Sequence, residues 1–384
     1  MKRITVLGCG LVGGLIVRDL AADEELSIRV GDASEQALDR VRELPRVETR
    51  KADLSDPVSI RDLVSDADVV VGAVPGRIGF SMLKTVVESG KPIADISFSP
   101  EDPLQLDELA ADRGATAIVD CGVSPGLSNL AVGRAASRLD QIEEAVIYVG
   151  GLPRERYWPW EYRIVFSATD VIEEYTRPAR VIENGVLVTR PALSEIEPLE
   201  FAGIGTLEAF NTDGLRTLLS TVPARNMREK TLRYPGHAER MRMLRESGFF
   251  SEHPIEVGGT SVVPRQMTER LLFTQWIRPP HEDEFTVLRV TVRGSAAGRM
   301  TTFEYDLFDQ TDRESGATSM ARTTGFPCAI AARMLLDGSC CTPGIRPLEK
   351  LAGDDRFYQR MVGELRSRGV HFEERETSLS GEED

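Results

Sequence analysis

Short apolar runs and segments with helical spacing alternate along the first 125 residues. The run 67–76 (ADVVVGAVPG) is apolar on both faces, as a central strand of a parallel sheet must be. Between such runs lie segments with helical periodicity, for example residues 79–90 (GFSMLKTVVESG). The expected strands are residues 3–7, 26–32, 47–54, 67–76, 91–97 and 115–122. Strands joined by helical crossovers in this way predict a doubly wound parallel α/β sheet.

Beyond residue 125 the periodicity changes to the alternation of antiparallel strands. The segment 180–190 (RVIENGVLVTR) predicts a hairpin, because Asn184-Gly185 is a dipeptide that type I′ turns prefer. The other expected elements are strands at residues 142–152, 162–168, 284–294 and 299–309 and a helix at 237–250. This part of the chain therefore predicts a mostly antiparallel α+β domain.

An apolar helical segment, residues 323–338, follows the antiparallel strands. We expect this helix to return and cover the first domain, which makes the second domain an insertion. The last eight residues, TSLSGEED, have the composition of a disordered tail. The expected division is residues 1–125 plus about 320–348, an inserted domain at 126–319, and a C-terminal helix with an acidic tail at 349–384.

The charge balance excludes some partners. The chain has 384 residues with 46 Lys and Arg against 61 Asp and Glu, a net charge of −15. Such a surface repels nucleic acid and anionic membranes, and no apolar run approaches the roughly 20 residues of a membrane-spanning helix. The start, MKRITVLGCG, runs directly into a strand and a glycine turn, unlike a signal peptide. Five cysteines without metal-site spacing favour a cytoplasmic protein with no metal.

Three glycines follow the first expected strand with the spacing G-x-G-x-x-G. Gly8 permits a tight turn, Gly10 lets the backbone approach a pyrophosphate, and Gly13 lets the next helix pack closely. Asp32 ends the second expected strand, where a carboxylate accepts the ribose hydroxyls and repels a 2′-phosphate. The expected cofactor contacts here are Gly8, Gly10, Leu11, Val12, Gly13 and Asp32. This unit predicts a Rossmann domain that binds NAD rather than NADP.

Ligands of doubly wound sheets bind outside the carboxyl ends of the strands. Asp53 stands where the adenine usually lies, and Ala73-Val74-Pro75 would lie beside the nicotinamide. The polar residues expected near the same edge are Asp95, Ser97 and Asp120. Each of these can equally be a turn residue or a helix cap.

The central segment 208–219, EAFNTDGLRTLL, gathers polar residues between apolar ones. Asn211, Thr212, Asp213 and Arg216 fall within six positions. Opposite charges at this spacing suit a site that holds a zwitterion. The same residues could also cap a helix start, with Asp213 favouring the helix dipole.

Several motifs together resemble a known family. In order, GCGLVGG with Asp32, VDCGVSPGLSN (119–129), EAFNTDGLRTLL and TLRYPGH (231–237) resemble the saccharopine dehydrogenase (saccharopine reductase-like) family, and within it the L-lysine 6-dehydrogenases. The resemblance spans roughly residues 3–345. It implies a Rossmann NAD-binding domain interrupted by a mixed-sheet domain that binds substrate and forms a homodimer. The implied activity is NAD-dependent oxidative deamination of the side-chain amine of L-lysine to its semialdehyde, allysine, with release of ammonia.

One departure from the family pattern bears on the substrate. Saccharopine reductases carry Asn-Arg-Asp-Ser where Asn211-Thr212-Asp213-Gly214 stand here. The missing Arg removes an anion partner for a substrate with an extra dicarboxylic arm. A smaller amino acid is therefore expected, unless Arg216 points inward and compensates.

Oxidation of an amine requires a neutral amine, so the site needs a base or a proton path. His237, in the motif RYPGH, is the first candidate, although it could instead be an exposed residue at a helix start. Arg233 or Arg216 is expected to bind the α-carboxylate, and Asp213 or Asp120 the ammonium. The remaining histidines, expected at the surface, are His253, His281 and His371.

Three other functions stay open. A saccharopine dehydrogenase or related opine dehydrogenase would share the fold and the cofactor. A non-catalytic NAD-binding protein would bind the cofactor without turnover of any amine. A reductase that forms amines in a polyamine pathway would favour a phosphorylated cofactor, against Asp32.

Overall fold

The computed structural model describes residues 1–279 and 282–378. The surface position expected for His281 and most of the expected disordered tail lie outside these residues. The first of the two large sheets has seven parallel strands in the order β17-β6-β5-β4-β1-β2-β3. Its strands are β1 (Lys2–Leu7), β2 (Leu26–Asp32), β3 (Val47–Lys51), β4 (Val69–Gly72), β5 (Ile93–Asp95), β6 (Thr116–Ile118) and β17 (Gly344–Ile345). The six strands expected from the sequence are confirmed.

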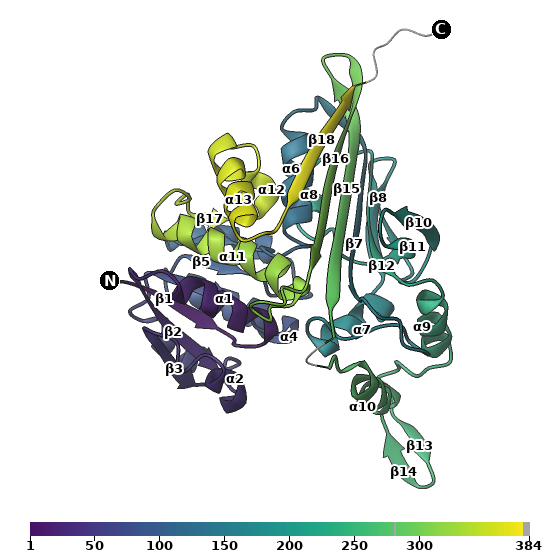
Figure 1. The fold of residues 1–384 in the computed structure, drawn as a ribbon, viewed down its shortest axis with the longest axis horizontal. Coiled ribbons are helices and arrows are strands. Elements are labelled where there is room, and N and C mark those ends of the chain that lie inside the picture. The colour runs from purple at the N-terminus through teal and green to yellow at the C-terminus, as the bar shows by residue number, and fades with distance from the viewer. Residues whose placement is uncertain (280–281, 379–384) are drawn as a thin grey trace.

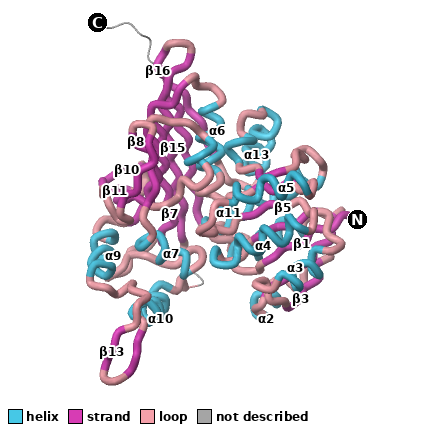
Figure 2. The backbone as a smooth tube through the Cα atoms, turned by 180° about the vertical axis from the view of Figure 1, so that it is seen from behind, coloured by secondary structure: helices cyan, strands magenta, loops and turns pink. Residues whose placement is uncertain are grey.

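Helices cover both faces of this sheet (Figures 1 and 2). They are α1 (Leu11–Ala21), α2 (Glu35–Asp39), α3 (Pro57–Val64), α4 (Gly76–Glu88), α5 (Asp107–Asp112) and α11 (Ser319–Leu336), with a short 3-10 turn at Pro103–Leu106. Helix α11 packs against α1, β4 and β5, although it lies more than 200 residues beyond all three in the chain. The buried side chains of α11, among them Ile330 and Met334, explain why an apolar helix follows the second domain. The domain boundaries themselves stay a prediction.

The second sheet is mixed and mostly antiparallel. Its path runs β10-β11-β12-β7-β15-β16-β18, with β8 beside β12 and β9 beside β8; only β12 and β7 run parallel. Its strands are β7 (Gln141–Pro153), β8 (Ala179–Glu183), β9 (Val186–Arg190), β10 (Glu197–Phe201), β11 (Gly205–Asn211), β12 (Asn226–Arg233), β15 (Glu284–Ala296), β16 (Arg299–Gln310) and β18 (Phe372–Ser378). The hairpin at 180–190 is confirmed, because Asn184 and Gly185 both have the positive φ of a type I′ turn.

The remaining elements surround the second sheet. They are α6 (Leu127–Ala136), α7 (Ala168–Thr176), α8 (Leu218–Thr221), α9 (His237–Glu246), α10 (Pro264–Trp276), α12 (Leu348–Leu351), α13 (Asp355–Ser367) and the hairpin of β13 (Ile255–Val257) and β14 (Thr260–Val262). Helices α7, α9 and α10 gather at one end of the sheet, and the β13–β14 hairpin extends away from them (Figure 1).

Two expectations about the second domain were wrong. Residues 162–166 are not a strand, because Tyr162 and Val165 bury their side chains from an irregular segment that leads into α7. Thr377 and Ser378, expected in a disordered tail, belong to β18, which pairs with β16 along Thr301–Leu307. β18 contains one buried apolar residue, Phe372, so its hydrophobic pattern carries almost no strand signal.

Candidate functional site

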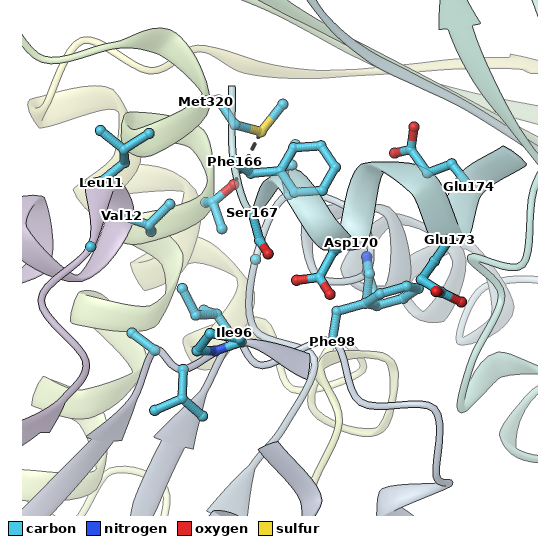
Figure 3. Close-up of a pocket in the computed structure, with 18 of the residues that line it drawn as sticks. Leu11, Val12, Ile96, Phe98, Phe166, Ser167, Asp170, Glu173, Glu174 and Met320 are labelled. Carbon is cyan, nitrogen blue, oxygen red and sulfur yellow. Dashed lines mark hydrogen bonds between the residues drawn. The ribbon is translucent and has the colours of Figure 1, made fainter. Parts of the chain in front are cut away.

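A cavity of about 600 Å³ lies between the carboxyl ends of the first sheet and the second domain. One end is formed by the glycine turn and the start of α1, and the other by α7 together with β11 and β12. Figure 3 shows Leu11 and Val12 at the first end and the carboxylates of α7 at the opposite end. The cavity therefore reaches from the nucleotide fold into the inserted sheet domain.

The glycine turn fits a dinucleotide. A Cβ on Gly8 would collide with the Ala73 carbonyl group, and Gly8 also has φ +103°. A Cβ on Gly13 would collide with the Gly8 carbonyl oxygen, whereas Gly10 has open space in that direction. No side chain of the described residues caps the start of α1, so its free N–H groups are available to a pyrophosphate. A nicotinamide dinucleotide bound here would supply the hydride acceptor.

Asp32 lies on the same wall with both carboxylate oxygens fixed. Its Oδ2 accepts the Cys9 N–H at 2.6 Å and its Oδ1 accepts the Ser34 N–H at 2.7 Å. Asp53 and Ser55 line the cavity beside it. A rigid carboxylate in this position can bind ribose hydroxyls and repels a 2′-phosphate.

At the expected nicotinamide edge, Ala73, Val74 and Pro75 all line the cavity. Ser97 and Asp95 lie behind that wall. The Val74 N–H donates to Ser97 Oγ at 3.3 Å, and the Ser97 N–H donates to Asp95 Oδ1 at 3.0 Å. Burial raises the pKa of Asp95 to about 7. These two residues therefore support the wall and do not face the ligand.

Asp120 and Arg216, expected in the site, are instead paired with each other outside the cavity. Arg216 Nη2 lies 3.1 Å from Asp120 Oδ1, both side chains are 2% exposed, and Arg216 also donates to the Ser99 carbonyl oxygen. Asn211 also lies outside the cavity, where its Nδ2 donates to Ser194 Oγ at 3.1 Å. The ion pair joins the first sheet to the second domain, and its charges are not available to a substrate.

His237, the expected base, does not line the cavity either. It is fully buried among aromatic rings, with Nδ1 2.9 Å from the Trp160 carbonyl oxygen and Nε2 2.9 Å from the Tyr175 hydroxyl. Because a carbonyl oxygen only accepts, Nδ1 carries the proton and Nε2 accepts from Tyr175. Burial, reinforced by Arg233, lowers the pKa of His237 to about 3. Its position argues against a role as base.

Thr212, Asp213 and Arg233 do face the cavity. Asp213 is held by Arg180 through two contacts of 2.9 Å. Arg233 is 2% exposed, is paired with Glu174, and lies over the ring of Tyr162. Among the described residues nothing accepts a hydrogen bond from Arg233 Nε.

Four carboxylates on the cavity wall escaped the sequence analysis. Asp170, Glu173 and Glu174 occupy positions i, i+3 and i+4 of α7 and share one helix face (Figure 3). Glu229 projects from β12. The i, i+3 and i+4 spacing of these three acidic residues could have indicated one face of a helix. The wrong prediction of a strand at 162–168 hid the start of that helix. Within the described residues, no group of three or more metal-ligating side chains is arranged to hold a metal ion.

A glycine turn for a dinucleotide, facing a charged cavity in a second domain, is the arrangement of an NAD(P)-dependent dehydrogenase. Residues 4–118 match the saccharopine dehydrogenase NADP-binding domain, and residues 122–370 match the saccharopine dehydrogenase C-terminal domain. The chain belongs to the saccharopine dehydrogenase family. No described helix is long and apolar enough to cross a membrane.

Relatives of known name agree with this assignment. The mitochondrial alpha-aminoadipic semialdehyde synthase of Mus musculus is 21% identical over 98% of this chain, which spans 48% of that protein. The L-glutamate-forming, NADP(+) saccharopine dehydrogenase of Schizosaccharomyces pombe is 22% identical over 97% of this chain and 99% of its own length. The apo structure of saccharopine dehydrogenase (L-Glu forming) from Saccharomyces cerevisiae superposes with a TM-score of 0.80, at 19% identity, over 98% of this chain and all of that one. The fold is therefore shared across the whole chain.

Proposed function

We propose that this protein catalyses the NAD-dependent oxidative deamination of the side-chain amine of L-lysine. The products are allysine (2-aminoadipate 6-semialdehyde) and ammonia. The observation that carries the proposal is the charge of the substrate end of the cavity. Five carboxylates, those of Asp170, Glu173, Glu174, Asp213 and Glu229, line this end against two guanidinium groups, those of Arg177 and Arg233. Arg180 and Arg265 pair with Asp213 and Glu173 from outside the lining, which leaves one carboxylate more than guanidinium groups. Such a wall favours a substrate with net positive charge, as lysine has.

Arg233 is the residue that we assign to the α-carboxylate of lysine. Arg233 is paired with Glu174, but it lines the cavity and its Nε has no acceptor among the described residues. Arg216, the other candidate, lies outside the cavity in its pair with Asp120. A buried donor without a partner is costly, and a bound carboxylate would satisfy it. The hydrophobic side chains near the nicotinamide wall, Phe166 and Met320, would keep the reacting carbon in a largely dry environment.

A saccharopine dehydrogenase is the runner-up. The names of the relatives favour it, and Arg177 and Arg233 could each bind a carboxylate of saccharopine. Against it, Thr212 stands where saccharopine reductases carry an Arg, and lysine has one carboxylate where saccharopine has three. A polyamine-pathway reductase and a non-catalytic NAD-binding protein are less well supported, the first because Asp32 opposes a phosphorylated cofactor.

The test is NADH formation at pH about 9–10, where the side-chain amine of lysine is substantially neutral. The panel is L-lysine, D-lysine, ornithine, saccharopine and Nε-blocked lysine. We expect NADH with L-lysine and none with the blocked form. Turnover of saccharopine without turnover of lysine would refute the proposal in favour of the runner-up, and cofactor binding without any turnover would indicate a non-catalytic protein.

We further propose that the protein acts as a homodimer in the cytoplasm. The support for the dimer is the family resemblance of the sheet domain, and the support for the compartment is that all five cysteines are free thiols. Light scattering of the purified protein tests the dimer, since a monomeric mass at micromolar concentration would contradict it.

A further inference from the structure

Glu229 is a buried carboxylate on the cavity wall without a cation beside it. It is 3% exposed and faces the cavity from β12. Three other carboxylates at the substrate end are paired with a guanidinium group: Glu174 with Arg233, Glu173 with Arg265, and Asp213 with Arg180. Asp170 is held by neutral donors, the Gly76 N–H and Ser167. No ion pair involves Glu229 within residues 1–279 and 282–378. With no guanidinium beside it, burial keeps Glu229 largely protonated below about pH 8, and a cation that arrives with the substrate would stabilise its ionised form.

The hydrogen bonds of Glu229 leave part of its carboxylate free. Thr212 Oγ1 donates to Glu229 Oε2 at 2.6 Å, the Gly214 N–H also donates to this carboxylate, and Thr212 Oγ1 lies 2.9 Å from Thr231 Oγ1. Both threonines also line the cavity. Since Thr212 donates its single proton to Glu229, Thr231 must donate to Thr212. The two hydroxyls fix the carboxylate but do not neutralise it.

The charged groups that face Glu229 are acids. Glu174 from α7 and Asp213 from the segment after β11 both disfavour its ionised form, and burial is the largest cause of a pKa raised to about 8. Arg233, four residues further along β12, forms an ion pair with Glu174. A carboxylate with a pKa in this range is ionised above about pH 8, or once an ammonium beside it stabilises its charge, and it can then accept a proton from that ammonium.

The two positions at which the segment 211–214 departs from the Asn-Arg-Asp-Ser pattern are the two that touch Glu229. Thr212 hydrogen-bonds to it, and a Cβ on Gly214 would lie 2.5 Å from its Cδ and Oε2. An Arg at position 212 would neutralise the carboxylate, and a side chain at position 214 would displace it. Thr212 and Gly214 therefore leave the Glu229 carboxylate without a neutralising cation and in its place on the cavity wall.

We propose that Glu229 binds the cationic amine of the substrate and takes its proton, which leaves the amine neutral for oxidation. In this step an N–H bond of the ammonium breaks and an O–H bond forms on the carboxylate, with no change in total charge. The proposal deepens the proposed function and rests on it for the identity of the amine. Glu229 is also the residue that selects an amine over an apolar chain end.

Binding without turnover tests this inference independently of activity. Calorimetry compares L-lysine with L-norleucine, which lacks the side-chain amine, for the wild-type protein and for Glu229→Gln. We expect the wild type to prefer lysine by at least about tenfold, a difference of roughly 1.4 kcal/mol, and the variant to lose that preference while it still binds norleucine. Glu349→Gln is the matched control, since Glu349 is equally buried but lies outside the cavity, and it should keep the preference.

Thr212→Arg provides a second variant that introduces the guanidinium of the family pattern. It should pair with Glu229 and abolish the preference for lysine, as Glu229→Gln does. A preference that persists in both variants, or a wild type that binds lysine no better than norleucine, overturns the inference. If the preference depends on Glu229 but lysine yields no NADH, Glu229 stands as an amine-binding residue and the proposed oxidation of lysine fails.

Discussion

At the scale of single residues, Asp32 is placed to decide between NAD and NADP. Two backbone N–H groups hold its carboxylate on the cavity wall, so it cannot turn away from a 2′-phosphate without losing both hydrogen bonds. Two close negative charges repel each other strongly in a partly enclosed site. The related fission-yeast enzyme is named for NADP(+), so Asp32 is the residue at which a difference in cofactor preference between the two proteins would be tested first.

Replacing Asp32 by Ser should therefore shift cofactor preference towards NADP. We expect the ratio of kcat/KM for NADP to that for NAD to rise at least about tenfold, roughly 1.4 kcal/mol, because the repulsion is removed. Initial rates with both cofactors measure the ratio. Asp112→Ser, an exposed change at the end of α5, should leave it unchanged. An unaltered ratio in Asp32→Ser would mean that the selectivity resides elsewhere.

The sequence could place on the cavity wall those residues whose position follows from the local backbone. Gly8 and Gly13 are required by close contacts within the turn, and these contacts follow from the local strand–turn–helix geometry. His237 was different, because a turn such as RYPGH does not fix the direction of the ring. That direction depends on Tyr175 and Trp276, which are distant in sequence. Glu229 was missed for the same reason, since its neighbours come from another strand and from α7.

At the scale of elements, the strands of the first sheet and the hairpin at 180–190 were predictable, because apolar runs at regular intervals and an Asn-Gly turn mark them. The segment that leads into α7 was not. Its apolar residues are buried against the aromatic cluster of Tyr175 and Trp276 and not against a neighbouring strand, so an apparent alternation arose without a sheet. The strands β10, β11, β12 and β18 also escaped detection. β12 buries charged side chains such as Glu229 and Arg233, and β18 has a single buried apolar residue, so neither shows the apolar alternation of a strand.

The ion pair of Asp120 and Arg216 connects two elements across the domain junction. Asp120 follows β6 and Arg216 follows β11, and both side chains are almost completely buried. Arg216→Met should lower the free energy of unfolding by about 3–5 kcal/mol, because it leaves a buried carboxylate unpaired. Urea denaturation followed by circular dichroism measures the loss. Asp120→Asn combined with Arg216→Met should recover a large part of it, and equal losses in the single and double variants would show that packing, not charge, dominates.

At the scale of the whole molecule, buried groups with displaced pKa values make stability depend on pH. His237 has a folded pKa of about 3 against 6.5 when unfolded, so the unfolded chain binds the proton more readily. The stability that this group contributes is present above pH 6.5 and is lost as pH falls towards 3. His237→Gln should therefore weaken the acid-side decline between pH 6.5 and pH 4, measured as the free energy of unfolding in urea. An unchanged decline would mean that other groups cause it.

Glu229 has the opposite effect on the pH dependence of stability, and the sign follows from the same linkage between folding and proton binding. Its folded pKa of about 8 lies above the value of 4.5 for a free Glu, so the folded protein keeps the proton that the unfolded chain releases. The stability it contributes is full below pH 4.5 and falls as pH rises towards 8, since ionisation inside the cavity is unfavourable. Glu229→Gln should flatten the decline between pH 5 and pH 8, whereas Asp112→Asn, exposed at the end of α5, should follow the wild type.

Saturating lysine should also flatten the decline of stability with pH in the wild type, because a bound ammonium stabilises the ionised carboxylate. It should have no such effect in Glu229→Gln. If lysine leaves the wild-type curve unchanged, the amine does not bind beside Glu229.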